Sequence, residues 1–255
     1  MYTRISQLLA DRKGGAVFSC FGIWHLLYMA VIFLAILALL LWLRGKNQQV
    51  RQRTVDRAIC FAFGLYMTDF FLMPFAYGAI DLEKLPFHVC TVMCVLCFIA
   101  RRNPALQKFR LPLAVLALAS NLIYTVYPAG VGWYQIHPLS YRVVQTLLFH
   151  GSMTTYGVLF LAYGGERLTW KQCRRTLPVL AGMTLWAMLG NWLYNGTAGD
   201  YDHFFNWFFV IRDPFYLLPE HIAPYIMPFV MVAVMFAAVV LVYAADSAIR
   251  KLIKK

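Results

Sequence analysis

Residues 14–43 read GGAVFSCFGIWHLLYMAVIFLAILALLLWL and contain no Asp, Glu, Lys or Arg. A helix that crosses the roughly 30 Å hydrocarbon layer needs about 20 mainly apolar residues, because each helical residue rises only 1.5 Å. This stretch is long enough to cross a bilayer, and too long for the apolar segment of a cleavable signal peptide. It therefore predicts a membrane helix near the start of the chain.

Four further stretches also lack every charged residue type: residues 111–141, 143–165, 176–199 and 221–245. They show no two-residue alternation, and a helix satisfies every backbone amide within its own segment, so we expect helices rather than strands. The whole chain is 61% hydrophobic and 13% charged, whereas a soluble domain has roughly 25% charged residues. The composition predicts an all-α polytopic membrane protein.

We predict one integral membrane domain over residues 1–255, without internal repeats, and about seven transmembrane helices. The predicted spans are residues 17–43, 57–77, 86–100, 111–127, 142–163, 177–194 and 222–243. With this number of spans, seventeen of the twenty-three Lys and Arg residues fall on one side of the membrane. Basic residues favour the cytoplasmic side, so the N-terminus is predicted outside and the C-terminus in the cytoplasm.

The formal net charge of +12 does not indicate a nucleic-acid partner, because the basic residues lie between the apolar runs and not on one face. We expect them to set the topology and to contact anionic headgroups, with membrane lipids as the partners. The expected location is the plasma membrane of a bacterium, as a multi-pass protein.

Polar side chains inside spans are costly, so each of them marks a candidate site. The candidates are His25, Asp69, His88, Cys90, Asn121, Tyr124, His150 and Asn191. At 1.5 Å per residue, six of them fall within roughly 5–15 Å of the predicted outer surface: His25, Asp69, Cys90, Asn121, His150 and Asn191. They predict one polar pocket that opens towards the outer leaflet.

Several of these residues also have a structural interpretation. Asn121 and Asn191 are typical of hydrogen bonds between helices, and His25 alone is typical of a packing histidine. A buried carboxylate without a partner is expensive, so we expect Asp69 to pair with His25 or His150, or else to stay protonated.

Cys90 is the candidate nucleophile. Pro86 suits the first turn of the third span, which places Cys90 near a helix N-terminus that favours a thiolate. Low dielectric opposes the thiolate, so a base is needed, and His150 is the candidate for a Cys–His pair in acyl transfer. Cys94 and Cys97 share the helix face of Cys90, and we interpret them as packing residues.

The run Leu85-Pro86-Phe87-His88-Val89-Cys90 resembles the Leu-Pro-Leu-His-Leu-Cys signature of the YwaF-type bacterial integral membrane family, which includes the animal transmembrane protein 164. The resemblance extends over residues 14–243. Further matching stretches are Phe149-His150-Gly151, Leu168-Thr169-Trp170-Lys171, Asn206-Trp207-Phe208-Phe209 and Pro224-Tyr225.

The resemblance implies a membrane-embedded acyltransferase that moves fatty acyl chains between phospholipids through a cysteine and a histidine. By motif, these residues are Cys90 and His150. A more distant group of lipid-ester hydrolases is also similar, so hydrolysis stays open. The chain departs from the family pattern in a segment inserted at residues 198–205, and in having Asp69 where glutamate is more usual.

The resulting hypothesis has Cys90 attacking a lipid ester with His150 as general base, and it requires no cofactor. Asp69 or His25 would orient the imidazole, and His88 or Asn191 would donate to the developing oxyanion.

Two alternatives belong to other classes. A zinc-dependent hydrolase would use His25, Asp69, His88 and His150, although the usual zinc-protease spacings are absent and nearby thiols would compete as ligands. A non-enzymatic transporter or accessory protein is the second alternative.

Overall fold

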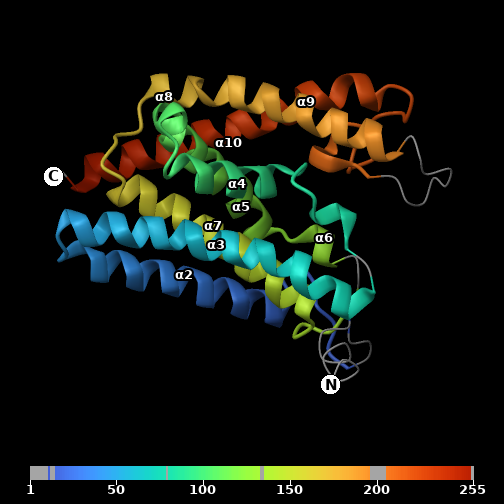
Figure 1. Cartoon of the computed structure of the whole chain (residues 1–255), viewed down its shortest axis with the longest axis horizontal. Coiled ribbons are helices and arrows are strands. Elements are labelled where there is room, and N and C mark those ends of the chain that lie inside the picture. The colour runs from blue at the N-terminus through green and yellow to red at the C-terminus, as the bar shows by residue number, and fades with distance from the viewer. Residues whose placement is uncertain (1–10, 12–14, 79, 133–134, 196–204, 254–255) are drawn as a thin grey trace.

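The computed structural model describes residues 11, 15–78, 80–132, 135–195 and 205–253. Within these ranges every regular element is a helix (Figure 1). The long helices are α2 (Ile23–Arg44), α3 (Gln48–Tyr77), α4 (Val89–Ala100), α5 (Arg110–Val126), α7 (Tyr141–Tyr163), α9 (Thr176–Asn195) and α10 (Ala223–Ile253). The short ones are η1 (Leu82–Lys84), η2 (Pro104–Phe109), α6 (Ala129–Gly132), α8 (Trp170–Arg174) and η4 (Trp207–Phe209). The predicted all-α fold is confirmed.

Each predicted span lies on one long helix, but three helix starts differ from the prediction. α2 begins at Ile23 rather than at residue 17. α3 begins at Gln48, because the Asn47 side chain caps it by accepting a hydrogen bond from the backbone N–H of Val50. α4 begins at Val89, after an extended His88, so the prediction that Pro86 opens the helix is wrong.

Within the described residues, four segments are long and apolar enough to cross a membrane: α2, α3 over residues Gln48–Phe75, the stretch Pro104–Gly132 that contains α5, and α10. α7 and α9 have 23 and 20 residues, but they carry more polar side chains. α4 is apolar and only 12 residues long. The chain is therefore a membrane protein with several apolar helices of spanning length.

α5 forms the centre of the bundle, and every residue from Leu111 to Asn121 is buried. α7 packs closely along α5, and a Cβ at Gly157 would lie 2.5 Å from the Cβ of Leu118. α2 approaches the other side of α7, where a Cβ at Gly151 would lie 2.7 Å from the Cδ1 of Ile32. Small residues at these two positions allow the helix backbones to come together, as is common between membrane helices.

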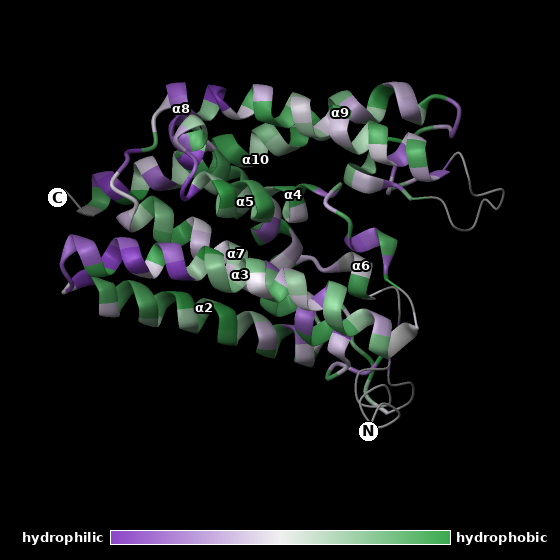
Figure 2. Cartoon of the chain, viewed as in Figure 1, coloured by the Kyte–Doolittle hydropathy of each residue, from purple (hydrophilic) through white to green (hydrophobic). Residues whose placement is uncertain are grey.

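The two ends of the bundle differ in charge. The α2–α3, α4–α5 and α7–α9 connections and the end of α10 carry most of the Lys and Arg residues and form the basic end, at the left of Figure 2. The α3–α4 and α5–α7 connections lie at the opposite end, here called the site end. The outer faces of α2 and α10 expose apolar side chains such as Leu34 and Phe229, as lipid contact requires.

Candidate functional site

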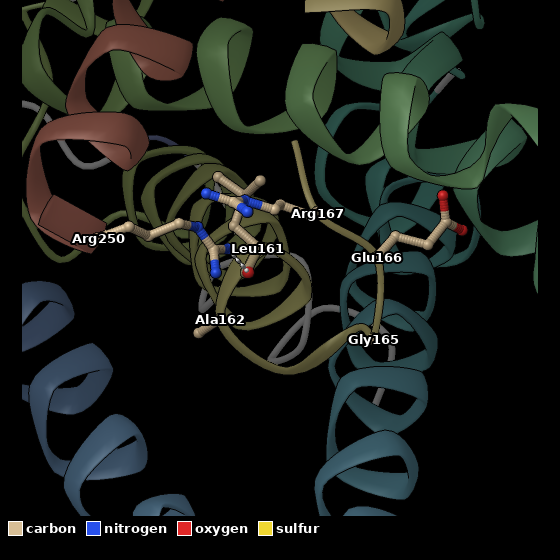
Figure 3. Close-up of a pocket in the computed structure, with 6 residues that line it drawn as sticks. All are labelled: Leu161, Ala162, Gly165, Glu166, Arg167 and Arg250. Atoms are coloured by element: carbon tan, nitrogen blue, oxygen red, sulfur yellow. Dashed lines mark hydrogen bonds between the residues drawn. The ribbon is translucent and has the colours of Figure 1, made fainter. Parts of the chain in front are cut away.

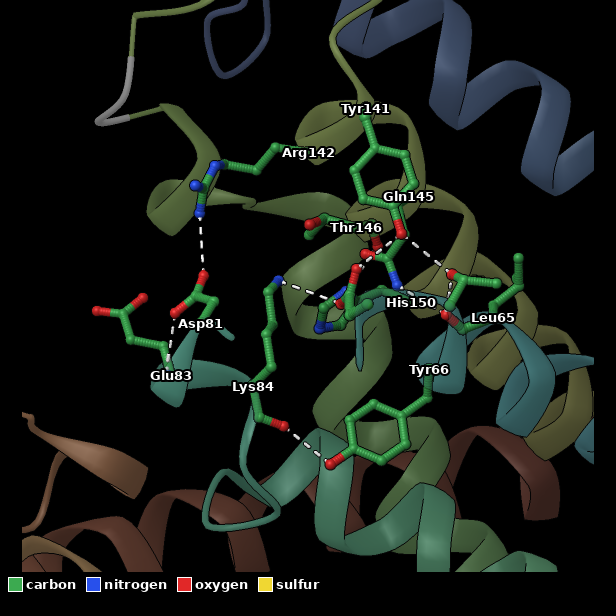
Figure 4. A network of polar contacts seen from close by, with 12 residues as sticks. Leu65, Tyr66, Asp81, Glu83, Lys84, Tyr141, Arg142, Gln145, Thr146 and His150 are labelled. Atoms are coloured by element: carbon green, nitrogen blue, oxygen red, sulfur yellow. Dashed lines mark hydrogen bonds and ion pairs between the residues drawn. The ribbon is translucent and has the colours of Figure 1, made fainter. Parts of the chain in front are cut away.

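The connection between α3 and α4 brings Lys84 into the site end of the bundle, where η1 is anchored to both neighbouring helices. Asp81 begins this turn by accepting a hydrogen bond from the backbone N–H of Glu83 (3.0 Å). The same carboxylate lies 3.2 Å from Nη1 of Arg142 on α7. On the α3 side, the Tyr66 hydroxyl donates to the carbonyl oxygen of Lys84 (2.8 Å). The Lys84 side chain thus starts from a fixed backbone (Figure 4).

Asp69 on α3 is the carboxylate partner of Lys84. Lys84 Nζ lies 3.5 Å from Asp69 Oδ2, and the Tyr141 hydroxyl donates to Asp69 Oδ1 at 3.0 Å. Asp69 is only 3% exposed, so these two neighbours reduce the cost of burying its charge. The predicted pairing with His25 or His150 is wrong, because both imidazoles instead bond to backbone carbonyl groups.

His150 on α7 is held by one hydrogen bond and by two aromatic rings. Its Nδ1 lies 2.8 Å from the carbonyl oxygen of Thr146, one turn earlier. The Tyr124 ring stacks on it with centroids 3.9 Å apart, and Phe149 meets it edge-on at 5.0 Å. The imidazole therefore has a fixed plane and a fixed direction.

The second nitrogen of His150 has no such partner. Among the described residues, Nε2 of His150 and the hydroxyl of Thr146 are buried without a hydrogen bond. A carbonyl oxygen only accepts, so Nδ1 holds the proton of the neutral ring and Nε2 presents a bare lone pair. Because buried polar atoms are usually paired, this nitrogen is a candidate acceptor for the proton of a thiol or a substrate.

Cys90 lies in the first turn of α4 and is half-buried. Within the described chain, no hydrogen bond joins its thiol to His150. Cys90, His88 and His150 all lie within electrostatic range of the Lys84 ammonium group. Tyr66 on α3 lies near both α4 and α7. Its hydroxyl is in electrostatic range of Cys90, and its ring lies 6.0 Å from that of Phe149, the neighbour of His150.

Cys94 and Cys97 follow Cys90 along α4 and are fully buried in the main core, at 0% and 2% exposure. Their predicted packing role is confirmed.

His88 caps the approach to α4 and contacts the segment after α9. Its Nδ1 accepts a hydrogen bond from the backbone N–H of Phe208 at 3.3 Å, which assigns the ring proton to Nε2. Its backbone carbonyl accepts from the Thr91 hydroxyl at 3.0 Å. His88 thus presents a proton donor at the site end, as an oxyanion-binding group requires.

Asn191 has a packing role. Its amide donates to the carbonyl oxygen of Trp207 (3.0 Å) and accepts from the Trp207 backbone N–H (2.9 Å). Asn195, one turn later, forms the same two-way pair with Phe205 at 2.8 Å. These pairs dock the segment that follows α9, so neither amide is available for an oxyanion. Residues 198–204, the bulk of the predicted insertion, lie outside the described residues.

His25 and Asn121 are also engaged in packing. The His25 ring accepts from the backbone N–H of Phe21 (2.9 Å) and lies 3.0 Å from the carbonyl oxygen of Thr125, so both ring nitrogens have partners. Asn121 donates to the carbonyl oxygen of Ala117 at 2.8 Å, while its own Oδ1 is buried without a partner among the described residues. His25 is therefore not available to orient His150.

Three residues of the site were not predicted as site residues: Lys84, Tyr141 and Thr146. Lys84 had a visible signal, because it is the single basic residue of its predicted loop and stands directly before the Leu85–Cys90 motif. Tyr141 and Thr146 had none, since hydroxyl residues are common in helices. Tyr141 gains its role from the packing of α7 against α3, and Thr146 contributes through its backbone carbonyl, which any residue type could supply.

A separate pocket of about 200 Å³ lies at the basic end, beside the C-terminal end of α7 (Figure 3). Its lining residues are Leu161, Ala162, Gly165, Glu166, Arg167 and Arg250. Arg250 pairs with Asp246 at 2.8 Å and donates to the carbonyl oxygen of Leu161 at 3.1 Å, which ties α10 to α7. We assign Arg250, and the pocket that it lines, a structural role, because cations stabilise helix C-termini.

The zinc-dependent alternative finds no ligand set here. Across the described ranges, no group of three or more His, Cys, Asp or Glu side chains is arranged to hold a metal ion. His25 lies against α5, with both nitrogens bonded, and Asp69 pairs with Lys84.

The TMEM164 family model matches residues 20–245, which include all the site residues described above. The chain belongs to the TMEM164 family. No curated protein and no solved structure matches it significantly. Membership confirms the transmembrane protein 164 part of the resemblance seen in the Leu85–Cys90 motif. Together with the apolar helices, it makes this TMEM164 family protein a multi-pass membrane protein.

Proposed function

We propose that this chain is a membrane-embedded lipid acyltransferase in which Cys90 is the nucleophile and His150 the general base. The observation that carries the proposal is the bare Nε2 of His150, buried without a partner in the described chain while Nδ1 is fixed on Thr146. A rigid neutral imidazole with one free lone pair is the form in which histidine accepts a proton.

Two further features support the assignment. Cys90 occupies the first turn of α4, where the partial positive charge of the helix N-terminus favours a developing thiolate. His88 holds its proton on Nε2 and, like Cys90, lies within electrostatic range of Lys84, so it is the oxyanion donor in this proposal. The Thr146 carbonyl, rather than Asp69 or His25, orients the base.

The reaction proceeds in two balanced steps. Cys90 passes its thiol proton to His150 Nε2 as sulfur bonds to the ester carbonyl carbon, and the C–O bond then breaks as the lysolipid oxygen takes that proton. In the second step, the hydroxyl of an acceptor lipid gives its proton to Nε2 as its oxygen bonds to the thioester carbonyl carbon. The C–S bond then breaks, and the Cys90 sulfur takes that proton back from Nε2, which restores the thiol and the neutral imidazole. Catalytic hydrogen bonds are often longer in empty sites than in substrate complexes, so the thiol and the ring have to close on the bound ester.

In this proposal the seven long helices all cross the membrane, with the N-terminus outside and the C-terminus in the cytoplasm. The accumulation of Lys and Arg at the basic end supports that orientation. α4 covers only about 18 Å at 1.5 Å per residue, so it relies on flanking residues to complete its crossing. The site end then faces the outer leaflet.

The test uses the purified full chain in phospholipid nanodiscs containing phosphatidylcholine with a labelled acyl chain and an unlabelled lysolipid acceptor. Mass spectrometry of the lipids follows acyl transfer, and intact-protein mass spectrometry detects a thioester on Cys90. We expect Cys90→Ser to abolish the thioester and to lower transfer by at least about 100-fold, because a serine hydroxyl is a much weaker nucleophile than a thiol.

Cys20→Ser is the matched control, because Cys20 is also a half-buried thiol and lies outside the site. It should retain transfer within about twofold. Labelled fatty acid in place of labelled lipid product would show that water is the acceptor and that the enzyme is a hydrolase. A thioester that survives in the Cys90 variant would disprove the nucleophile assignment.

A further inference from the structure

Lys84 is a cation in the site that the proposed acyl transfer does not use. It extends from η1 into the site (Figure 4), and its side chain is 21% exposed, so it is partly open to the surroundings. Its charge acts on Cys90 and His150 together. A lysine in this position can meet a group that enters from outside.

The position of this ammonium group is fixed while its bonding capacity is largely unused. The backbone is held by the Tyr66 hydroxyl on the Lys84 carbonyl and by the Asp81–Arg142 pair. The distance from Lys84 Nζ to Asp69 is 3.5 Å, longer than the roughly 2.7–2.9 Å of a strong charge-assisted bond. An ammonium group has three N–H donors, so Asp69 orients the group and leaves donors available for another acceptor.

In the proposed topology, the order of groups along α7 from the site end parallels the order of groups in a glycerophospholipid. Lys84 pairs with Asp69 at the level of Tyr141, and His150 lies nine residues further along α7, about 13 Å of helix rise. Its ring points back one turn, to Thr146. In a phospholipid the phosphate lies nearer to water than the ester carbonyls do, and here the ammonium group lies nearer to the site end than the His150 ring does.

We propose that Lys84 binds the phosphate group of the lipid whose ester reaches Cys90, with Asp69 and Tyr141 holding it in place. This inference rests on the proposed acyl transfer and adds its specificity residue. Lysine is a common phosphate ligand as a point charge, and at a partly buried position its attraction is less screened than at an open surface. The site then selects phospholipids over neutral glycerolipids.

The experiment compares dioleoyl phosphatidylcholine with dioleoylglycerol, which has the same acyl chains and no phosphate. The full chain and its Lys84→Gln and Lys84→Arg variants are assayed in detergent micelles for acyl loss from each lipid. Binding of each lipid is measured separately by native mass spectrometry. Lys46→Gln, at the basic end, is the matched control for removal of one lysine charge.

We expect Lys84→Gln to raise KM and weaken binding for phosphatidylcholine by about 10- to 100-fold, the usual range for one hydrogen bond to a charged group. Its kcat for phosphatidylcholine, and its binding of dioleoylglycerol, should change less than about threefold. Lys84→Arg should restore most of the binding, because it keeps the charge.

An equal loss for both lipids would overturn the proposal and give Lys84 a purely structural role, and so would unchanged phosphatidylcholine binding in Lys84→Gln. If the wild type binds phosphatidylcholine through Lys84 but never loses an acyl chain, the acyl-transfer function fails while the phosphate site stands. The binding and turnover measurements therefore test the phosphate site and the acyl transfer independently.

Discussion

His25 and His150 are buried histidines that contact consecutive residues of α5, and they differ in whether the second ring nitrogen has a hydrogen-bond partner. His25 contacts the Thr125 carbonyl with one nitrogen and the Phe21 backbone N–H with the other. His150 stacks on Tyr124 and bonds through Nδ1 only, so its Nε2 is left bare in the described chain. Burial of an imidazole therefore does not by itself mark a candidate catalytic residue, whereas a buried ring nitrogen without a partner in the described chain does.

The largest effect that tests this comparison is expected for His150→Ala. Acyl transfer should fall by about 10² to 10⁴-fold, the usual contribution of a general base, because the thiol proton then has no acceptor. The protein should still purify as a folded monodisperse species, since His150 makes a single hydrogen bond. Lipid mass spectrometry on cells that express either protein provides the measurement. Retention of full transfer would remove His150 from the mechanism.

His25→Ala should show the opposite behaviour. The substitution leaves the Phe21 N–H and the Thr125 carbonyl without their partner. We expect the free energy of unfolding to fall by about 1–3 kcal/mol, with activity per folded molecule changed less than about threefold. Thermal unfolding in detergent, normalised against turnover, separates the two effects. A selective loss of turnover would contradict the packing role.

Asp213 lies in the connection before α10 and extends the comparison to a polar group whose hydrogen-bond partners are all close in sequence. Its substitution should have the smallest effect of the three. The backbone N–H of Phe215, together with those of Leu217 and Leu218, holds the pKa of the Asp213 carboxyl below its ordinary value of 3.8. A lowered folded-state pKa means that this stabilisation is complete above the unfolded value and is lost as pH falls through the folded one.

Asp213→Asn should therefore lower Tm slightly at neutral pH and flatten the decline of Tm between about pH 4 and pH 2. A pH series of thermal unfolding curves for both proteins measures the difference. An identical acid profile in the variant would show that these backbone hydrogen bonds contribute nothing to stability.

The site was predictable where a residue's chemistry is unusual for its surroundings. Cys90 and His150 stand out in apolar helices, and both contribute to the proposed mechanism. The same reasoning selected His25 and Asn191, whose hydrogen bonds turn out to be internal. A polar residue in an apolar run shows that a partner is needed, but the sequence does not say whether that partner is the backbone, another side chain or a substrate.

The sequence by itself determined that the chain is helical and membrane-embedded, because uncharged runs of this length satisfy their backbone only as helices in lipid. Its Leu85–Cys90 motif also identified the family, which the match over residues 20–245 confirms. Only the tertiary structure decided which polar atoms are paired. Lys84 meets Asp69, and His150 retains a bare nitrogen, because helices far apart in the chain bring specific carbonyls and carboxylates within reach of some side chains and not of others.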